Sequence, residues 1–255
     1  MTIDSTGVFD SFRLEAWNHE FAGQLSVVTI VGGVPSNDRV AEGWIKSKLG
    51  LTNDRIIQEA VAQTMAERGV TADEATKIVN EMKNLNGFKR DDKGLYIEGR
   101  QLKAAIKEAA SVALAAGKLE KRGWGETNKG LLSFLAEHVF VVEDRLHLVD
   151  ADGNNITAPT NINQRFVSTF RGTGIQYEEY VAEANISFTV RTDYEFSEKD
   201  WAMIWLTGEQ QGLGASRSQG YGRYTITRWD AVRSVPRAKP VAKKAAAAAK
   251  KADTE

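Results

Sequence analysis

The sequence predicts an α+β protein with a ferredoxin-like, or RRM-like, core. Residues 25–31, LSVVTIV, form a β-branched apolar run that is typical of a buried central strand. Residues 100–116 carry apolar and small side chains at helical spacing. The later patterns predict strands at 138–142, 180–192 and 221–229, with a helix at 197–207 before the last strand. This βαββαβ order is that of the ferredoxin-like fold.

The composition is that of an ordinary globular protein and excludes several kinds of site. Of the 255 residues, 42% are hydrophobic and 26% are charged, which allows a sizeable core. No apolar run is long enough to cross a membrane, and no signal segment is recognisable. The chain has no cysteine, and its three histidines, His19, His138 and His147, lack ligand spacing. We therefore expect a cytoplasmic protein without a metal, a cofactor or a membrane partner.

The net charge of −1 conceals an uneven distribution of charge. Residues 237–255 contain six basic and two acidic residues, which leaves 27 basic and 32 acidic residues in positions 1–236. We expect 1–236 to form a single domain and 237–255 to form a disordered, basic, Lys/Ala-rich tail. Because the domain itself is acidic, any nucleic-acid site on it must be a local patch.

A helical insertion is predicted after the first strand. Gly32 and Gly33 end the strand, and three helical patterns follow within residues 38–86. The last of them begins with a capping box formed by Thr71 and Glu74. The sequence indicates no specific role for this insertion.

The predicted helix at 100–116 has one apolar face and one basic face. Its alanine-rich face favours close packing against a sheet. Lys103 and Lys107 lie one turn apart on the other side, where they can add positive charge along a groove. The polar loop at 118–130 places basic residues around Trp124, a pattern that suits base stacking but is also common on solvated surfaces.

The middle of the chain predicts a projecting segment with basic and aromatic side chains. Asp152 and Gly153 form a turn signal. Residues 159–178 then carry Arg165 and Arg171 among aromatic residues, with few acids. We expect a long loop or hairpin here, with both arginines available to nucleic acid.

Residues 201–229 combine a helix, a glycine-rich loop and a strand. The loop carries, in order, Gly214, Arg217, Ser218, Gly220, Gly222 and Arg223. Bare backbone and guanidinium groups allow close approach to a phosphate chain. A flexible surface loop is the alternative reading of this segment. In the strand, alternation predicts that Tyr224 and Ile226 face one side and Trp229 the other.

Three segments together resemble the RAMP superfamily of CRISPR-associated proteins. GLGASRSQGYGRY resembles the signature glycine-rich loop between the last helix and the last strand of that superfamily. YIEGRQLKAAIKEAA resembles its turn and helix after the first core strand, and VTIVGGVPSN resembles that strand with its following glycine. The resemblance spans most of residues 20–230, and two of these motifs are specific.

The resemblance implies a backbone-type subunit of a CRISPR-type effector complex. Such subunits have a ferredoxin-like palm, a helical insertion (here about 38–86) and a thumb hairpin (here about 143–180). They stack as a helical filament, a homo-oligomer, along a guide RNA and contact other subunits of the complex. The bound strand reads sequence by base pairing, and the protein holds its backbone.

The chain also departs from this family. Lys103 and Lys107 stand where many relatives carry arginine, and the insertion is longer than in a minimal member. No aspartate matches the backbone-cleaving residue of some relatives, so we assign no catalytic residue.

Other functions fit the same predicted fold. A viral or other assembly protein would use the glycine-rich loop as a contact between subunits and the tail as a DNA tether. A single-stranded nucleic-acid-binding protein could use the same fold. A metal-independent ribonuclease would need a general base, for which His19 is the candidate. A single histidine beside a strand more often has a structural role.

Overall fold

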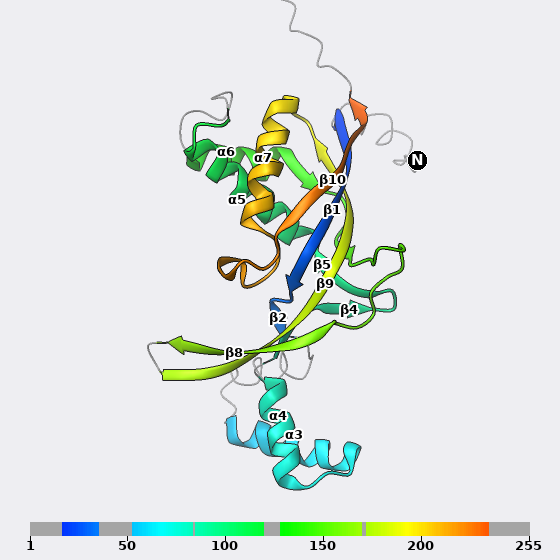
Figure 1. Ribbon diagram of the computed structural model, residues 1–255, viewed down its shortest axis with the longest axis vertical. Coiled ribbons are helices and arrows are strands. Elements are labelled where there is room, and N and C mark those ends of the chain that lie inside the picture. The colour runs from blue at the N-terminus through cyan, green and yellow to red at the C-terminus, as the bar shows by residue number, and fades with distance from the viewer. Residues whose placement is uncertain (1–16, 36–52, 84, 120–127, 170–171, 235–255) are drawn as a thin grey trace, which may run out of the picture.

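The computed structural model describes residues 17–35, 53–83, 85–119, 128–169 and 172–234 (Figure 1). Four of the expectations above lie outside these residues. They are the first helix of the insertion, at about 38–49, the part of the polar loop that carries Trp124, the basic tail at 237–255, and Arg171.

A twisted, mostly antiparallel sheet forms the centre of the molecule. Its core strands are β1 (His19–Val31), β6 (Val139–Val141), β9 (Gly172–Thr192) and β10 (Tyr224–Ser234). They lie in the order β10-β1-β9-β6, and each neighbouring pair is antiparallel. The one parallel pairing of the sheet among the described residues joins β3 (Leu85–Gly87) to β9. Helix α5 (Gly99–Ala115) precedes β6 in the chain, and α7 (Glu198–Gln211) connects β9 to β10. This arrangement confirms the predicted α+β, ferredoxin-like class.

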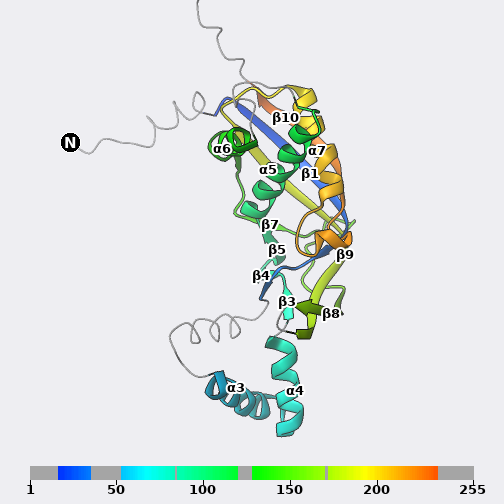
Figure 2. The ribbon, with the colours of Figure 1, turned by 90° about the vertical axis from the view of Figure 1, so that its left-hand side faces the viewer.

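The helices α5 and α7 pack side by side on one face of the sheet (Figures 1 and 2). Their buried side chains include Leu102, Ile106 and Ala109 of α5 and Trp201, Ile204 and Trp205 of α7. Helix α7 begins at a complete capping box, in which Ser197 Oγ accepts from the Asp200 N–H over 3.1 Å. Both helices lie within a few residues of their predicted bounds because capping and amphipathic patterns are local signals.

A β-bulge in β10 makes one predicted orientation wrong. Leu25 pairs with Ile226 and Gln24 pairs with Arg228, which leaves Thr227 as an extra residue. The extra residue moves Trp229 to the same side as Ile226. There its ring stacks on Phe21, with 4.8 Å between the ring centroids. Strict alternation predicted the opposite face for Trp229, because alternation assumes a strand without a bulge.

A further helix and a second small sheet complete the core. The sequence indicated short extended segments at 95–97 and within 138–149, but it predicted neither the helix nor the pairing of the sheet. Helix α6 (Asn128–His138) begins where a loop was expected and buries Leu131 and Leu135. The strands β4 (Lys89–Asp91), β5 (Gly94–Glu98) and β7 (Arg145–His147) form a three-stranded antiparallel sheet. Leu95, Ile97 and Leu146 of this sheet belong to the same hydrophobic core as α5.

The hairpin expected within residues 159–178 is confirmed. It consists of β8 (Asn161–Thr169) and the first part of β9, and it projects from the body of the molecule (Figure 1). The projection arises because β1 pairs with β9 only as far as Tyr180, whereas β9 begins at Gly172.

Two helices of the insertion lie where the second and third helical patterns predict them. They are α3 (Asn53–Arg68) and α4 (Ala72–Lys83), placed at the opposite end of the molecule from α6 and α7 (Figures 1 and 2). The short strands β2 (Val34–Pro35) and β3 (Leu85–Gly87) pair with each other at the base of this insertion. No helix among the described residues is long and apolar enough to span a membrane.

Candidate nucleic-acid interface

The glycine-rich loop between α7 and β10 is closed onto the end of β1. The Leu213 N–H donates to the Gly222 carbonyl over 2.8 Å, which joins the two ends of the loop. The N–H groups of Gly222 and Ala215 donate to the carbonyls of Thr29 and Val31, over 2.6 and 3.0 Å. Residues 212–222 therefore form an ordered element, which argues against the alternative of a flexible surface loop.

Two positions in this loop require glycine for two reasons each. Gly214 and Gly222 have φ angles of +89° and +75°, a region that other L-residues adopt at a cost of about 1–2 kcal/mol. A Cβ on Gly222 would lie 1.9 Å from the Leu213 carbonyl oxygen, and a Cβ on Gly214 would lie 2.8 Å from the Val31 carbonyl oxygen. The glycines thus allow the close approach of backbone to backbone that closes the loop.

The outer part of the loop presents unused backbone donors. Ser216 adopts a left-handed conformation (φ +56°, ψ +26°) immediately before the short 3-10 turn η1 (Arg217–Gln219). The N–H groups of Ser216, Arg217 and Ser218 donate no hydrogen bond within the described part of the chain. Successive N–H groups in such a turn converge on one concavity, which is the geometry of a backbone nest for anions.

The base of the β8–β9 hairpin is fastened to the same loop. Asn163 Nδ2 donates to Tyr221 Oη over 3.3 Å. Ser216 Oγ donates to Glu178 Oε1 over 2.9 Å, and the same oxygen lies 3.0 Å from Arg165 Nη2. The buried Glu178 carboxylate therefore links Arg165 of the hairpin to the loop, and the two segments form one continuous surface.

Carboxylates hold two arginines of this surface, Arg165 and Arg217, in different ways. Arg165 and Glu178 are largely buried, with 24% and 2% of their side chains exposed. Arg217 Nη1 lies 2.6 Å from Glu108 Oε2, and this pair is 34% and 44% exposed. Breaking a buried pair costs about 3–5 kcal/mol, whereas an exposed pair contributes about 0.2–1 kcal/mol. Arg165 is therefore a fixed anchor, and Arg217 is free to exchange its partner.

The remaining predicted residues fall into two groups. Arg223, Ser218 and Gly220 are exposed, and the Arg223 side chain forms no hydrogen bond or ion pair within the described residues. Lys103 is directed to α6, where its Nζ donates to the Ala136 carbonyl over 2.8 Å and lies 4.0 Å from the Phe140 ring centroid. Burial lowers the pKa of Lys103, and the charge of Lys107 adds to this effect. Lys103 thus supports α6 instead of the loop.

Sequence reasoning missed the acids that organise this surface, and it did not place Gly32, Gly33 and Gly87 beside the loop. Glu108 and Glu178 carry no local sequence signal, because their partners are distant in the chain. A small pocket beside the loop is lined by Gly32, Gly33, Gly87 and Gly214, together with Lys89 and Tyr96. A Cβ on Gly32 would lie 2.1 Å from the Gly87 carbonyl carbon, so the end of β1 and β3 approach each other closely as well.

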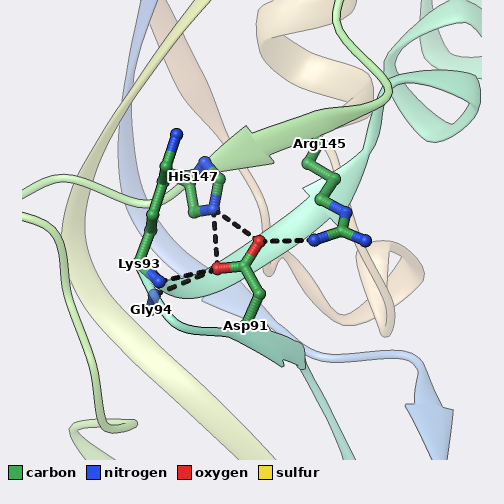
Figure 3. A network of polar contacts seen from close by, with 5 residues as sticks. All are labelled: Asp91, Lys93, Gly94, Arg145 and His147. Atoms are coloured by element: carbon green, nitrogen blue, oxygen red, sulfur yellow. Dashed lines mark hydrogen bonds and ion pairs between the residues drawn. The ribbon is translucent and has the colours of Figure 1, made fainter.

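The polar network around Asp91 has a structural role (Figure 3). Its carboxylate contacts His147 Nε2 at 2.9 Å and accepts from Arg145 Nη1 at 2.9 Å and from the Lys93 N–H at 3.0 Å. Burial acts to raise the pKa of Asp91, but the hydrogen bonds from His147, Arg145 and the Lys93 backbone outweigh it. They hold this pKa far below its usual range. Such a carboxylate is a poor proton acceptor. Because Asp91 belongs to β4 and both Arg145 and His147 belong to β7, the network joins these two strands.

The histidine required by the ribonuclease alternative lies away from this surface. His19 is 3% exposed and stands at the first residue of β1. The glycine-rich loop contacts Thr29 and Val31 at the other end of the same strand. His19 is therefore not placed to act on a strand bound at the loop.

Comparisons with known proteins find similarity in structure only. No family model matches the sequence, and no curated protein matches it. The chain is similar to a chain in the cryo-EM structure of the Type III-B Cmr-beta complex bound to cognate target RNA. The identity is 11% and the TM-score 0.47, over 91% of this chain and 68% of that chain. It is also similar to a chain of a Type IV-B CRISPR complex, with 10% identity and a TM-score of 0.43, over 86% and 95% of the two chains. Similarity at this level assigns no function to the chain.

Proposed function

We propose that this chain is a non-catalytic, RNA-binding backbone subunit of a CRISPR-type effector complex in the cytoplasm. It holds a guide RNA, or another single strand, along the surface formed by the glycine-rich loop and the base of the β8–β9 hairpin. Copies of the chain line up along that strand beside other subunits. The observation that carries the proposal is the fastening of these two segments through Glu178 and through Asn163.

The chemistry of this surface suits a phosphate backbone. The unused N–H groups of residues 216–218 and the guanidinium groups of Arg217 and Arg223 are donors for phosphate oxygens. Phe166 on the hairpin is 77% exposed and offers a ring on which a base can stack. These contacts read no sequence, which fits a protein that leaves recognition to base pairing. The resemblance of the loop to the RAMP signature supports RNA as the strand.

A second candidate function is assembly without nucleic acid, and one feature favours it. A groove of about 930 Å³ lies between α7 and β10, which is an edge strand among the described residues. Its apolar lining includes Phe21, Phe196, Trp201, Trp205 and Trp229. A groove of this kind suits contact with another protein chain. Under this function the purified chain forms regular assemblies that contain no bound strand.

The Arg217→Ala/Arg223→Ala variant is expected to bind a labelled single-stranded RNA about tenfold more weakly than the unchanged protein, because it lacks two charge-assisted hydrogen-bond donors to phosphate. The slope of log K against log salt concentration should become less steep by about 0.7 for each phosphate group that is no longer neutralised. Fluorescence anisotropy at several salt concentrations measures both quantities.

The matched control is Arg191→Ala/Arg228→Ala, which removes the same charge from elsewhere on the sheet. Arg191 forms an ion pair with Glu20, and Arg228 forms one with Asp230. In the sheet, Arg191 lies opposite Glu20 and Arg228 lies opposite Gln24, toward the start of β1. The proposal requires this control to retain its affinity. A reduced affinity in the control alone would place the strand on the open face of the sheet and contradict the proposal.

A further inference from the structure

The Arg217 guanidinium is already occupied by a carboxylate in the structure. Its Nη1 lies 2.6 Å from Glu108 Oε2, across the junction between the glycine-rich loop and α5. We propose that Glu108 is a placeholder for a phosphate group. It holds Arg217 in the unbound chain, and a bound strand displaces it. This inference rests on the proposed function and concerns the regulation of that same site.

The two partners differ in how firmly the fold holds them. Glu108 lies on α5, whose N-terminus is capped by Gln101 and whose apolar face packs into the core. Arg217 lies in η1, at the outer part of the loop, where a change of side-chain rotamer alone redirects its guanidinium group. The carboxylate is thus the fixed member of the pair, and the arginine is the mobile one.

The Arg217–Glu108 pair can exchange because it is exposed, whereas the Arg165–Glu178 pair cannot because it is buried. The Arg217–Glu108 pair is 34% and 44% exposed, so water can solvate Glu108 after Arg217 leaves. In contrast, Glu178 would remain as an uncompensated buried charge if Arg165 left it.

This arrangement sets a threshold for binding, because a polyanion must compete with Glu108 for the guanidinium group. Glu108 therefore lowers the affinity of the surface for isolated phosphate groups.

The Glu108→Gln variant is expected to bind single-stranded RNA about two- to fivefold more tightly, which corresponds to the usual worth of an exposed ion pair. Arg217 is then a full net cation before binding. The slope of log K against log salt should consequently become steeper by up to about 0.7. Anisotropy titrations of the full chain with labelled RNA measure both effects, and thermal unfolding checks that the variant is folded.

A double-mutant cycle that combines Glu108→Gln with Arg217→Ala separates the proposed competition for Arg217 from the general effect of removing a negative charge near the strand. If Glu108 acts by holding Arg217, its substitution changes nothing in the Arg217→Ala background. A tighter binding that persists in this background comes from removing an acid near the strand and would overturn the inference. Glu20→Gln is the matched control, because it releases Arg191 from a pair of the same length, 2.6 Å, at the other end of β1. Its affinity is expected to stay unchanged.

The outcomes distinguish the two proposals. If Arg217→Ala weakens binding while Glu108→Gln has no effect, the placeholder is refuted and the proposed function stands. If the unchanged protein binds no RNA, or if Arg217→Ala binds as well as the unchanged protein, the proposed site itself is refuted.

Discussion

The Gly222→Ala variant is expected to bind RNA more than about tenfold more weakly, and to unfold at a lower temperature, because the loop that carries the donors can no longer close. The added Cβ would lie 1.9 Å from the Leu213 carbonyl oxygen and 2.7 Å from its nitrogen. Both are backbone atoms, so relief requires the loop to open. Opening breaks the hydrogen bonds from Leu213 to Gly222 and from Gly222 to Thr29. Circular dichroism melts and RNA anisotropy measure the two effects.

Gly220→Ala provides a control, because Gly220 also has a positive φ angle but an added Cβ there causes no clash. Gly220 has a φ of +90°, but a Cβ at this position would meet no atom within 4 Å. This variant incurs only the cost of the left-handed conformation, about 1–2 kcal/mol. It should therefore keep most of its affinity for RNA. Equal reductions of affinity in the two variants would mean that closure at Leu213 is not what shapes the loop.

The Glu178→Ala variant is expected to lower the free energy of unfolding by about 3–5 kcal/mol, since it leaves the Arg165 guanidinium partly buried and without its carboxylate. Glu178 is 1% exposed, and it holds both Arg165 and Ser216. The hairpin and the loop should separate when it is removed. Urea unfolding monitored by tryptophan fluorescence measures the decrease in stability.

The double variant Arg165→Met/Glu178→Leu tests the cause of that decrease. Replacing both members of a buried ion pair by apolar side chains is often neutral for stability. We therefore expect the double variant to regain most of the stability that Glu178→Ala removes. Its affinity for RNA should remain reduced, because Ser216 no longer has its acceptor. A double variant as unstable as Glu178→Ala alone would show that the instability does not come from the unpaired Arg165.

The parts of the fold that follow local rules were predictable from the sequence. The capping box at Ser197, the alanine-rich face of α5 and the β-branched run of β1 each depend on residues within one or two turns of the element itself. The positions of Gly214 and Gly222 were predictable in the same way, although the reason for each glycine became clear only from the opposing backbone atoms.

The remaining features depend on contacts between distant parts of the chain. Nothing near Glu108 indicates that it meets Arg217, 109 positions away. Likewise, nothing near Glu178 marks it as a buried link to Ser216. The β-bulge that changes the side on which Trp229 lies depends on the pairing of β10 with β1. Helix α6 has a recognisable signal in the spacing of Leu131, Phe134, Leu135 and His138, but the preceding polar loop concealed it.

Photo-crosslinking of bound RNA, followed by mass spectrometry of the crosslinked peptides, tests the central claim most directly. The full chain would be irradiated with a single-stranded RNA at low salt, without any substitution that disturbs the fold. The account predicts crosslinks in the glycine-rich loop, at Tyr221 above all, and in the hairpin residues around Phe166. Crosslinks confined to the aromatic groove between α7 and β10, or to the open face of the sheet around Arg191, would contradict it.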